Sequence, residues 1–205
     1  MAGSPVERRL VALVMLDLVG YPRLMGQDEG GTFERVAAHR REVVEPAVAA
    51  HRGRIVKLTG DGALCELPSL VEAVECARLL QRATEERERT LPQGQRLRLR
   101  IGVTIGDVMQ DEDGDVFGEG VNLAARLEAL AEPGGICLSA TAYEEVRGKV
   151  GCRFEDLGER TLENIDRPIR VFRVVEGAAA APPGPRRRRF WPSSRGSCRS
   201  PPRPG

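Results

Sequence analysis

Residues 54–67, with the sequence RIVKLTGDGALCEL, restrict the fold of this chain more than any other stretch. Two β-prone runs flank Gly60-Asp61-Gly62, which supplies the backbone freedom of a tight turn. The stretch therefore predicts a β-hairpin with a carboxylate at its tip. An aspartate at such a place is commonly structural, because Asp-Gly tolerates positive φ.

A second carboxylate, Asp17, lies near the end of the apolar run 10–18, LVALVMLDL. An ionised carboxylate in a buried strand is costly unless another group compensates its charge. If this strand neighbours the hairpin, Asp17 and Asp61 can share a divalent cation, because hard cations prefer oxygen ligands. The two aspartates together therefore indicate a site of the magnesium type.

The hydrophobic pattern of the whole chain alternates strands with helices. Strands are expected at 9–18, 54–58, 63–67, 97–104 continuing through 106–108, 136–139, 154–157 and 169–175. Helices are expected at 33–51, 70–89, 121–131 and 140–146, and residues 19–25 are expected to form a turn. This order predicts an α+β, ferredoxin-like arrangement in which helices pack on one face of an antiparallel or mixed sheet.

Several local features refine this outline. Thr32 and Ser69 are expected to cap the first two helices, and Pro46 predicts a kink or a division of the first helix. Asp107, which follows Gly106, is expected to be a turn residue. The helix at 70–89 is expected to expose one charged face, which consists of Glu75, Arg78, Arg82, Glu85 and Glu86.

The composition divides the chain into a folded part and a basic end. The chain has 205 residues, which suits one domain with extensions. Residues 177–205 contain seven Arg and no acid; since the net charge of the chain is +1, residues 1–176 carry a net −6. We expect a polar lead-in at 1–8, a folded domain at 9–176 and a disordered Pro/Arg-rich tail at 177–205.

Other counts exclude whole classes of protein. The five Cys form no CxxC pair and are expected to be buried or free thiols in a reducing compartment. The two His residues argue against a zinc or copper site. No apolar run is long enough to span a bilayer, and the first residues lack the apolar segment of a signal peptide. The sequence predicts a cytoplasmic protein with no integral membrane segment.

Asn122 and Arg126 are four residues apart on a predicted helix and therefore share one face. An amide and a guanidinium on one face can hold a phosphate group. A helix-surface pair without a binding role is equally compatible with this spacing. The glycines of the GxG at 118–120 are expected to form a turn, because GxG without a third glycine is a weak phosphate-binding signal.

Three motifs give the chain a family resemblance: LDLVGY at 16–21, KLTGDG at 57–62 and DVFGEGVNLAARLE at 115–128. They resemble the catalytic motifs of class III nucleotidyl cyclases, in the bacterial branch that is often fused to other domains. The runs RIGVTIGDV at 100–108, LAEPGGICLS at 130–139 and FEDLGERTLENIDRPIRVFRV at 154–174 are also similar. The resemblance covers about residues 8–175, and several motifs in the right order are more specific than one.

The resemblance implies a metal site and a reaction. Asp17 and Asp61 match the metal-binding aspartates, which would hold two Mg²⁺ or Mn²⁺ ions, and the backbone carbonyl of Leu18 lies where the family adds a ligand. The implied reaction is attack of the ribose 3′-oxygen on the α-phosphorus of ATP, which gives cyclic AMP and pyrophosphate.

The resemblance also assigns the remaining residues. Lys57 and Asp115 match the pair that selects adenine, and a Glu would be expected in place of Lys57 for guanine. Asn122 and Arg126 match the residues that orient the ribose and stabilise the α-phosphate charge. In the family, active sites form at the interface of a head-to-tail dimer, so a homodimer is implied.

One residue departs from the family pattern. Near the end of the domain the family usually has a basic residue that helps to hold the triphosphate, but the sequence TLENI places Glu163 there. This departure favours an alternative, a catalytically weak or silent cyclase-like module that dimerises and binds nucleotide as a regulatory part. A nucleic-acid binder that acts through the basic tail is a third hypothesis, and our prediction includes no nucleic-acid partner. A cyclic-dinucleotide synthase is disfavoured because no GG(D/E)EF stretch is present.

Overall fold

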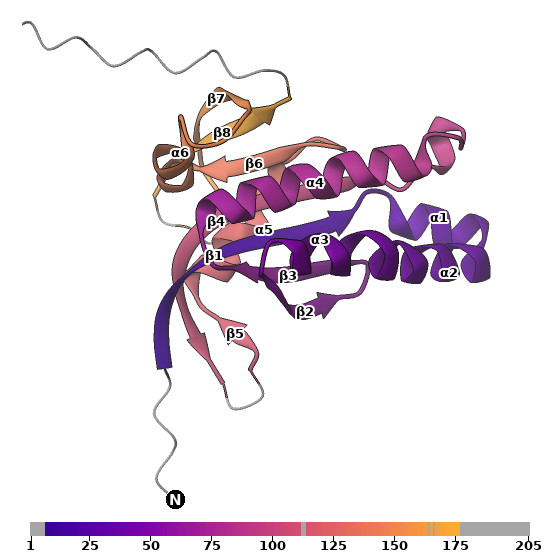
Figure 1. Ribbon diagram of the computed structural model, residues 1–205, viewed down its shortest axis with the longest axis horizontal. Coiled ribbons are helices and arrows are strands. Elements are labelled where there is room, and N and C mark those ends of the chain that lie inside the picture. Colours follow the sequence, from indigo (N-terminus) through magenta and orange to yellow (C-terminus); the bar gives the residue numbers. More distant parts are fainter. Residues whose placement is uncertain (1–6, 112–113, 164, 166, 177–205) are drawn as a thin grey trace, which may run out of the picture.

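The computed structural model describes residues 7–111, 114–163, 165 and 167–176. Its centre is one eight-stranded sheet in the order β2-β3-β1-β4-β6-β8-β7, with β5 paired to β4 off this path (Figure 1). The strands are β1 Glu7–Leu18, β2 Arg54–Thr59, β3 Gly62–Leu67, β4 Leu99–Gln110, β5 Val116–Phe117, β6 Ile136–Ser139, β7 Arg153–Arg160 and β8 Ile169–Val175. The pairing of β4 with β6 is parallel, and the other pairings are antiparallel.

The helices follow the strands in the predicted alternation. They are α1 Tyr21–Gln27, α2 Glu29–His39, the π-helical turn η1 Arg40–Val44, α3 Glu45–Ala50, α4 Leu70–Glu88, the 3₁₀ turn η2 Gln93–Gln95, α5 Glu119–Leu130 and α6 Ala140–Val146. The segment from β1 to β4 has the spatial strand order β2-β3-β1-β4, with helices between β1 and β2 and between β3 and β4. This is a split βαβ arrangement, so the predicted ferredoxin-like α+β fold is confirmed.

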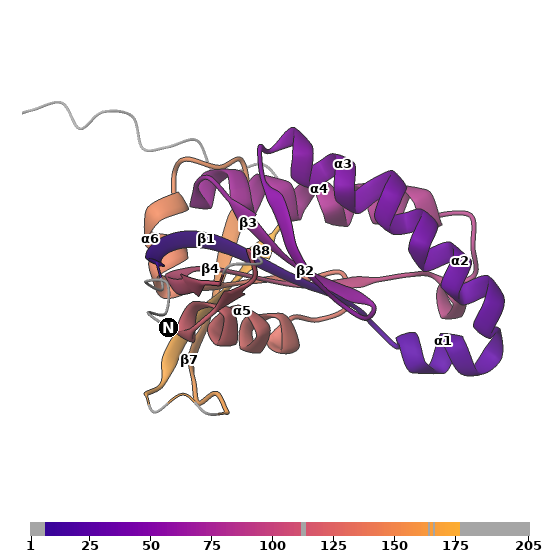
Figure 2. The same ribbon diagram turned by 90° about the horizontal axis from the view of Figure 1, so that it is seen from below.

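Helices cover both faces of the sheet, and the expectation of a single covered face is wrong. Val14 and Leu16 of β1 belong to a core cluster with residues of α3, α4 and α6, whereas Leu13 clusters with Ala124 of α5. Figure 2 shows α3 and α4 on one side of the sheet and α5 on the other. The continuous apolar run of β1 has the composition of a strand that is buried on both faces.

Helix α5 lies directly against β4 because two glycines leave room for its backbone. A Cβ atom at Gly102 would lie 2.3 Å from the carbonyl oxygen of Ala124, and one at Gly106 would lie 2.5 Å from the Cα of Gly120. Both separations are shorter than real side-chain contacts. The two glycines of the RIGVTIGD stretch therefore set the height of α5 above the sheet.

The region between β1 and β2 differs from the prediction in detail. Residues 21–27 form α1 rather than a turn, and Gly20 begins the helix with a φ of +72°. The cap of α2 is Asp28, whose side chain accepts from the Gly31 amide; the hydroxyl of Thr32 instead donates to the Leu24 carbonyl at 3.1 Å. The division expected near Pro46 is confirmed, because η1 separates α2 from α3.

Helix α4 begins as predicted, with the Ser69 side chain accepting from the amide of Glu72. Its charged face is not wholly solvated, because Arg78 is buried. The Arg78 guanidinium donates to Glu75, to Glu176 beyond β8 and to the Gly151 carbonyl. This side chain therefore ties α4 to the last strand instead of facing solvent.

Several other predictions have an outcome in the structure. Strand β1 begins at Glu7, two residues before its expected start, and Asp107 lies inside β4 opposite Leu10 rather than in a turn. Cys65, Cys76, Cys137 and Cys152 are buried free thiols, as expected. The predictions for residues 1–6, the tail 177–205 and Cys198 fall outside the described residues. None of the helices in the described ranges is long and apolar enough to cross a membrane.

Candidate active site

The tip of the predicted hairpin meets the end of β1. Strands β1 and β3 are antiparallel neighbours, and Leu16 pairs with Ala63. A Cβ atom at Gly62 would lie 2.4 Å from the Leu16 carbonyl oxygen and 3.1 Å from Oδ1 of Asp17. Because Gly62 has no side chain, the turn that carries Asp61 can approach Asp17, and the predicted neighbourhood of the two aspartates is confirmed.

The surroundings of Asp61 favour the protonated form of its carboxyl group. Burial raises the pKa of Asp61, and the negative charge of Asp17 and a hydrogen bond between the two side chains raise that pKa further. Two neighbouring carboxylates repel each other unless a proton or a cation lies between them. The pair therefore fits a hard divalent cation, which would gain two oxygen ligands and neutralise both charges.

Further metal ligands would have to come from other groups. The described residues contain no cluster of three or more His, Cys, Asp or Glu that could hold a metal ion. Leu18, whose backbone carbonyl is the third ligand predicted, directly follows Asp17 at the end of β1. Two carboxylates and a backbone oxygen leave coordination positions for water or for the oxygens of a bound phosphate.

Two residues that the sequence did not indicate complete this group. Arg100 lies opposite Asp17 in the β1–β4 register, and its Nη2 donates to Oδ2 of Asp17 at 3.1 Å. The Nε atom of Arg100 is 2.8 Å from Oε1 of Glu128 on α5. Burial raises the pKa of Glu128 to about 7, although the charge of Arg100 acts in the opposite direction. We call Asp17, Leu18, Asp61, Arg100 and Glu128 the acidic group.

The predicted base-selecting residues also meet. Lys57 of β2 donates to Oδ2 of Asp115 at 2.5 Å, and this hydrogen bond holds the pKa of Asp115 below its usual range. The Lys57 ammonium lies 5.4 Å from the centre of the Phe117 ring. The backbone amide of Asp115 donates to Oδ1 of Asp111 at 2.9 Å.

Asn122 and Arg126 lie on α5, as predicted. The backbone amide of Asn122 donates to the Gly118 carbonyl in the first turn of the helix. The guanidinium of Arg126 contacts Glu163 twice: Nε donates to its backbone oxygen at 3.1 Å, and Nη1 lies 3.3 Å from its Oε2. We call Lys57, Asp115, Phe117, Asn122, Arg126 and Glu163 the paired group, because each of its four charged side chains contacts an opposite charge within the group.

The two groups share one side of the sheet. Asp17 alternates with residues of β1 that face α4, so its side chain points to the α5 face. Lys57 pairs across the hairpin with Leu64, which clusters with Ala124 of α5. Among the described residues, no hydrogen bond or ion pair joins an aspartate of the acidic group to a residue of the paired group.

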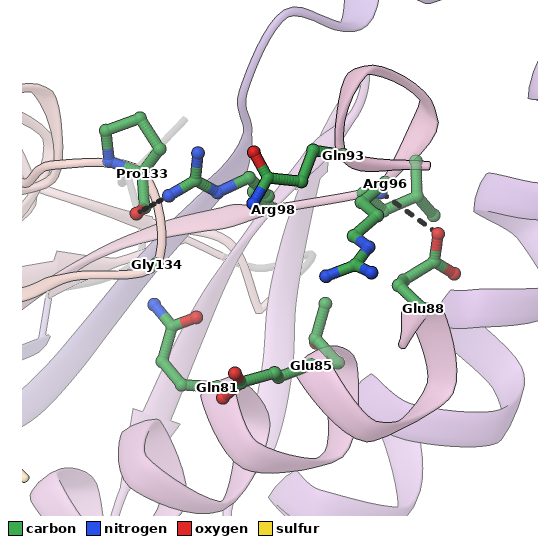
Figure 3. Close-up of a pocket in the computed structure, with 10 residues that line it drawn as sticks. Gln81, Glu85, Glu88, Gln93, Arg96, Arg98, Pro133 and Gly134 are labelled. Atoms are coloured by element: carbon green, nitrogen blue, oxygen red, sulfur yellow. Dashed lines mark hydrogen bonds between the residues drawn. The ribbon is translucent and has the colours of Figure 1, made fainter. Parts of the chain in front are cut away.

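A polar pocket of about 520 Å³ lies elsewhere, between α4, the η2 turn and the turn at 133–134 (Figure 3). Two of its charged side chains are already hydrogen-bonded to the backbone: Nη2 of Arg98 donates to the Pro133 carbonyl, and Glu88 accepts from the amide of Leu97. None of its lining residues belongs to either group. A smaller pocket of about 100 Å³ lies beside the hairpin tip and includes Asp61.

Comparison with known proteins gives consistent results. The family described as the adenylate and guanylate cyclase catalytic domain matches residues 7–174. A protein of Rhizobium meliloti (strain 1021) named "Putative adenylate cyclase 3" is 47% identical over 172 residues, which are 84% of this chain and 29% of that protein. An adenylate cyclase of Streptomyces coelicolor is 35% identical over 141 residues, 69% of this chain and 35% of that protein.

A solved structure agrees with the sequence comparisons. The crystal structure of an adenylate/guanylate cyclase/hydrolase from Silicibacter pomeroyi has 44% sequence identity and a TM-score of 0.78, and the match covers 84% of this chain and 100% of that chain. The chain spans only about a third of the length of the two relatives named above. The family match extends over nearly all the described residues and confirms the resemblance seen in the motifs. This chain therefore belongs to the class III adenylate and guanylate cyclase catalytic domains.

Proposed function

We propose that this chain is an adenylyl cyclase catalytic domain that converts ATP to cyclic AMP and pyrophosphate. The observation that carries the proposal is the approach of Asp61 to Asp17, which puts two carboxylates together where only a proton or a cation makes the arrangement favourable. The relative of Rhizobium meliloti, whose name describes an adenylate cyclase, supports the choice of substrate.

The metal requirement follows from the acidic group. Class III cyclases generally depend on two metal ions, and the oxygens of Asp17, Asp61 and Leu18 would hold Mg²⁺ or Mn²⁺ here. When bound, such ions lower the pKa of the ribose 3′-hydroxyl and neutralise phosphate charge. Nη2 of Arg100 donates to Oδ2 of Asp17 at 3.1 Å, and it is Oδ1 of Asp17 that lies near Gly62 of the hairpin.

Adenine selection follows from the Lys57–Asp115 pair. An ammonium donates to the ring nitrogen N1 of adenine, and a carboxylate accepts from its 6-amino group. Guanine has a donor at N1 and an acceptor at position 6. The Lys57 ammonium would then face a donor and the Asp115 carboxylate an acceptor, so neither side chain could form its hydrogen bond. A site built to hydrogen-bond one base discriminates strongly, because the wrong base leaves buried polar groups unpaired.

The reacting phosphate falls to Asn122 and Arg126. The Asn122 amide is suited to orienting the ribose, and the Arg126 guanidinium is suited to stabilising the charge that develops on the α-phosphate. The 3′-oxygen gives its proton to solvent water and bonds to the α-phosphorus, and the bond from the α-phosphorus to the bridging oxygen breaks to release pyrophosphate. Each of these side chains acts only after the nucleotide is held by both groups.

A homodimer reconciles the positions of the two groups. Lys57 and Asp61 are four residues apart on one hairpin, yet they would serve opposite ends of the nucleotide. In a head-to-tail pair of identical chains, the acidic group of one copy faces the paired group of the other. Two equivalent sites would result, each with a complete set of residues.

The experiment that tests this function is a product assay. Purified protein is incubated with Mn²⁺ and either ATP or GTP, and cyclic AMP and cyclic GMP are measured for the wild type and Asp61→Ala. We expect cyclic AMP from the wild type, little cyclic GMP, and neither product from the variant. Equal products from the two nucleotides would contradict the adenine assignment.

A second function, a catalytically weak or silent regulatory module, is favoured by one specific observation. Glu163 replaces the family's basic residue and also contacts Arg126. Nucleotide binding without cyclic AMP formation would support that alternative.

A further inference from the structure

Glu163 lies in the segment between β7 and β8, and its side chain is 76% exposed. The segment is anchored by the buried side chain of Leu162 and by a hydrogen bond from the amide of Ile165 to the Leu162 carbonyl. This anchoring places both the backbone oxygen and the carboxylate of Glu163 next to Arg126. Two acceptors of one residue therefore occupy one guanidinium.

Phosphate and carboxylate oxygens compete for the same guanidinium, because both bind it through charge-assisted hydrogen bonds. Arg126 is the residue that the proposed function assigns to the α-phosphate. A nucleotide that reaches Arg126 must displace the Glu163 carboxylate or bind beside it. Binding beside it would place a carboxylate against phosphate oxygens of the same sign.

We propose that Glu163 is an intramolecular competitor of the nucleotide phosphates for Arg126, and that nucleotide binding requires release of the Arg126–Glu163 contact. This inference rests on the proposed function and identifies a residue that lowers the affinity of the same site. It differs from the mere loss of a basic triphosphate ligand, because a competitor acts through its own negative charge. A neutral residue at position 163 is then enough to raise the affinity.

The exposure of the pair limits the size of the effect. The Arg126 side chain is 35% exposed and that of Glu163 is 76% exposed, so solvent screens their attraction. Exposed ion pairs of this kind change an equilibrium constant by up to about fivefold. The contact therefore reduces the affinity for nucleotide and does not abolish binding.

The test measures binding without turnover. Calorimetric titration of the full chain with 3′-deoxy-ATP in the presence of Mn²⁺ gives a dissociation constant, because this nucleotide lacks the attacking hydroxyl. The variants are Glu163→Gln, Glu163→Lys and the matched control Glu159→Gln, whose carboxylate lies on the exposed surface of β7. Thermal unfolding of each variant confirms that it is folded.

We expect Glu163→Gln to lower the dissociation constant about threefold to fivefold and Glu163→Lys to lower it further, while Glu159→Gln leaves it unchanged. Binding by all variants with equal constants would overturn the competitor role and leave the cyclase proposal intact. A gain for Glu163→Lys alone would also overturn it, because only the missing positive charge would then matter. No binding by the wild type or by any variant would overturn both proposals.

Discussion

The acidic group and the paired group lie on the same face of one sheet but differ in how their charges are balanced. Asp17 and Asp61 approach each other as like charges, and burial raises the pKa of Asp61. Lys57 and Asp115 form an ion pair, and Arg126 contacts Glu163. The first group is incomplete without an added cation, whereas the second is already satisfied within the chain.

This difference separates the two costs of binding a nucleotide. A bound cation removes the repulsion between the carboxylates of the acidic group, so metal binding should raise the free energy of unfolding. The paired group must exchange its internal partners for adenine and phosphate, so its affinity depends on how firmly those partners are held. Removing a carboxylate from the acidic group should therefore raise the free energy of unfolding in the absence of metal, whereas breaking an ion pair of the paired group should lower it.

The largest effect is expected for Asp61→Asn. Cyclic AMP formation should fall by about a hundredfold or more, because the cation loses one of its two carboxylates. The free energy of unfolding in EDTA should rise, because the substitution removes a carboxylate whose pKa is raised by burial and by the charge of Asp17. Activity assays and urea unfolding in EDTA measure the two changes.

The wild type supplies the control for this prediction. Mn²⁺ should raise its melting temperature, and the increase should disappear in Asp61→Asn, because only the cation-binding form gains from the metal. An equal shift in both proteins would mean that the metal binds elsewhere and that the acidic group does not need a cation.

Arg100→Gln tests whether the chain partly supplies its own cation. Arg100 contacts Asp17 at 3.1 Å and Glu128 at 2.8 Å, and its side chain is 31% exposed. Removing the guanidinium leaves the carboxylates of Asp17 and Glu128 without their positively charged partner, so the free energy of unfolding in EDTA should fall by about 3 kcal/mol. Mn²⁺ should restore part of the loss. The control is Arg98→Gln, which removes the hydrogen bond from Arg98 to the Pro133 carbonyl; an equal loss in both variants would contradict the role of Arg100.

The hairpin and its aspartate could be predicted from the sequence because their signals are local. Turn residues between two β-prone runs define the hairpin, and Asp17 interrupts an otherwise apolar strand. The contacts of Arg100 and Glu163 could not be predicted in this way. They depend on the register between β1 and β4 and on the path of the segment after β7, which join residues 83 and 37 positions apart.

The incorrect predictions about the fold have physical causes as well. The apolar run of β1 has no alternation, so its pattern does not say whether one or both faces are covered. Asp28 and Thr32 are both suitable helix caps, and the choice depends on the Leu24 carbonyl, which binds the Thr32 hydroxyl. Arg78 has the spacing of a surface residue, but the end of β8 brings Glu176 to it.

Gly106→Ala tests how the paired group is positioned. The added Cβ would lie 2.5 Å from the Cα of Gly120, so the first turn of α5 must move away from β4. Overpacking of this kind should lower the free energy of unfolding by about 2 kcal/mol. Because Asn122 lies on that turn, cyclic AMP formation should fall more than metal binding does. The control is Gly26→Ala, where the added Cβ meets nothing within 4 Å; equal losses in activity would contradict this role of the glycine.

The smallest effect is expected for His39, a buried residue. Its titration changes the stability of the fold over the same acidic pH range as that of Asp61, so the two contributions must be separated. Its ring accepts or donates a hydrogen bond with the Thr84 hydroxyl at 2.8 Å. Burial lowers its pKa from 6.5 to about 4, with a smaller contribution from Arg87, while Glu88 and Glu42 act in the opposite direction.

Between pH 6.5 and pH 4 the unfolded chain binds more protons at His39 than the folded chain does, so the free energy of unfolding falls as the pH falls. Protonation of Asp61 has the opposite sign, because its pKa is raised in the folded chain. In EDTA the two effects would partly hide each other.

His39→Gln removes the titrating ring and retains a hydrogen-bonding side chain beside Thr84. The loss of stability from pH 7.5 to pH 5.5 should therefore be about 1 kcal/mol smaller in His39→Gln than in the wild type. Urea unfolding at the two pH values measures this difference, and equal losses in both proteins would mean that His39 is not kept neutral by its burial.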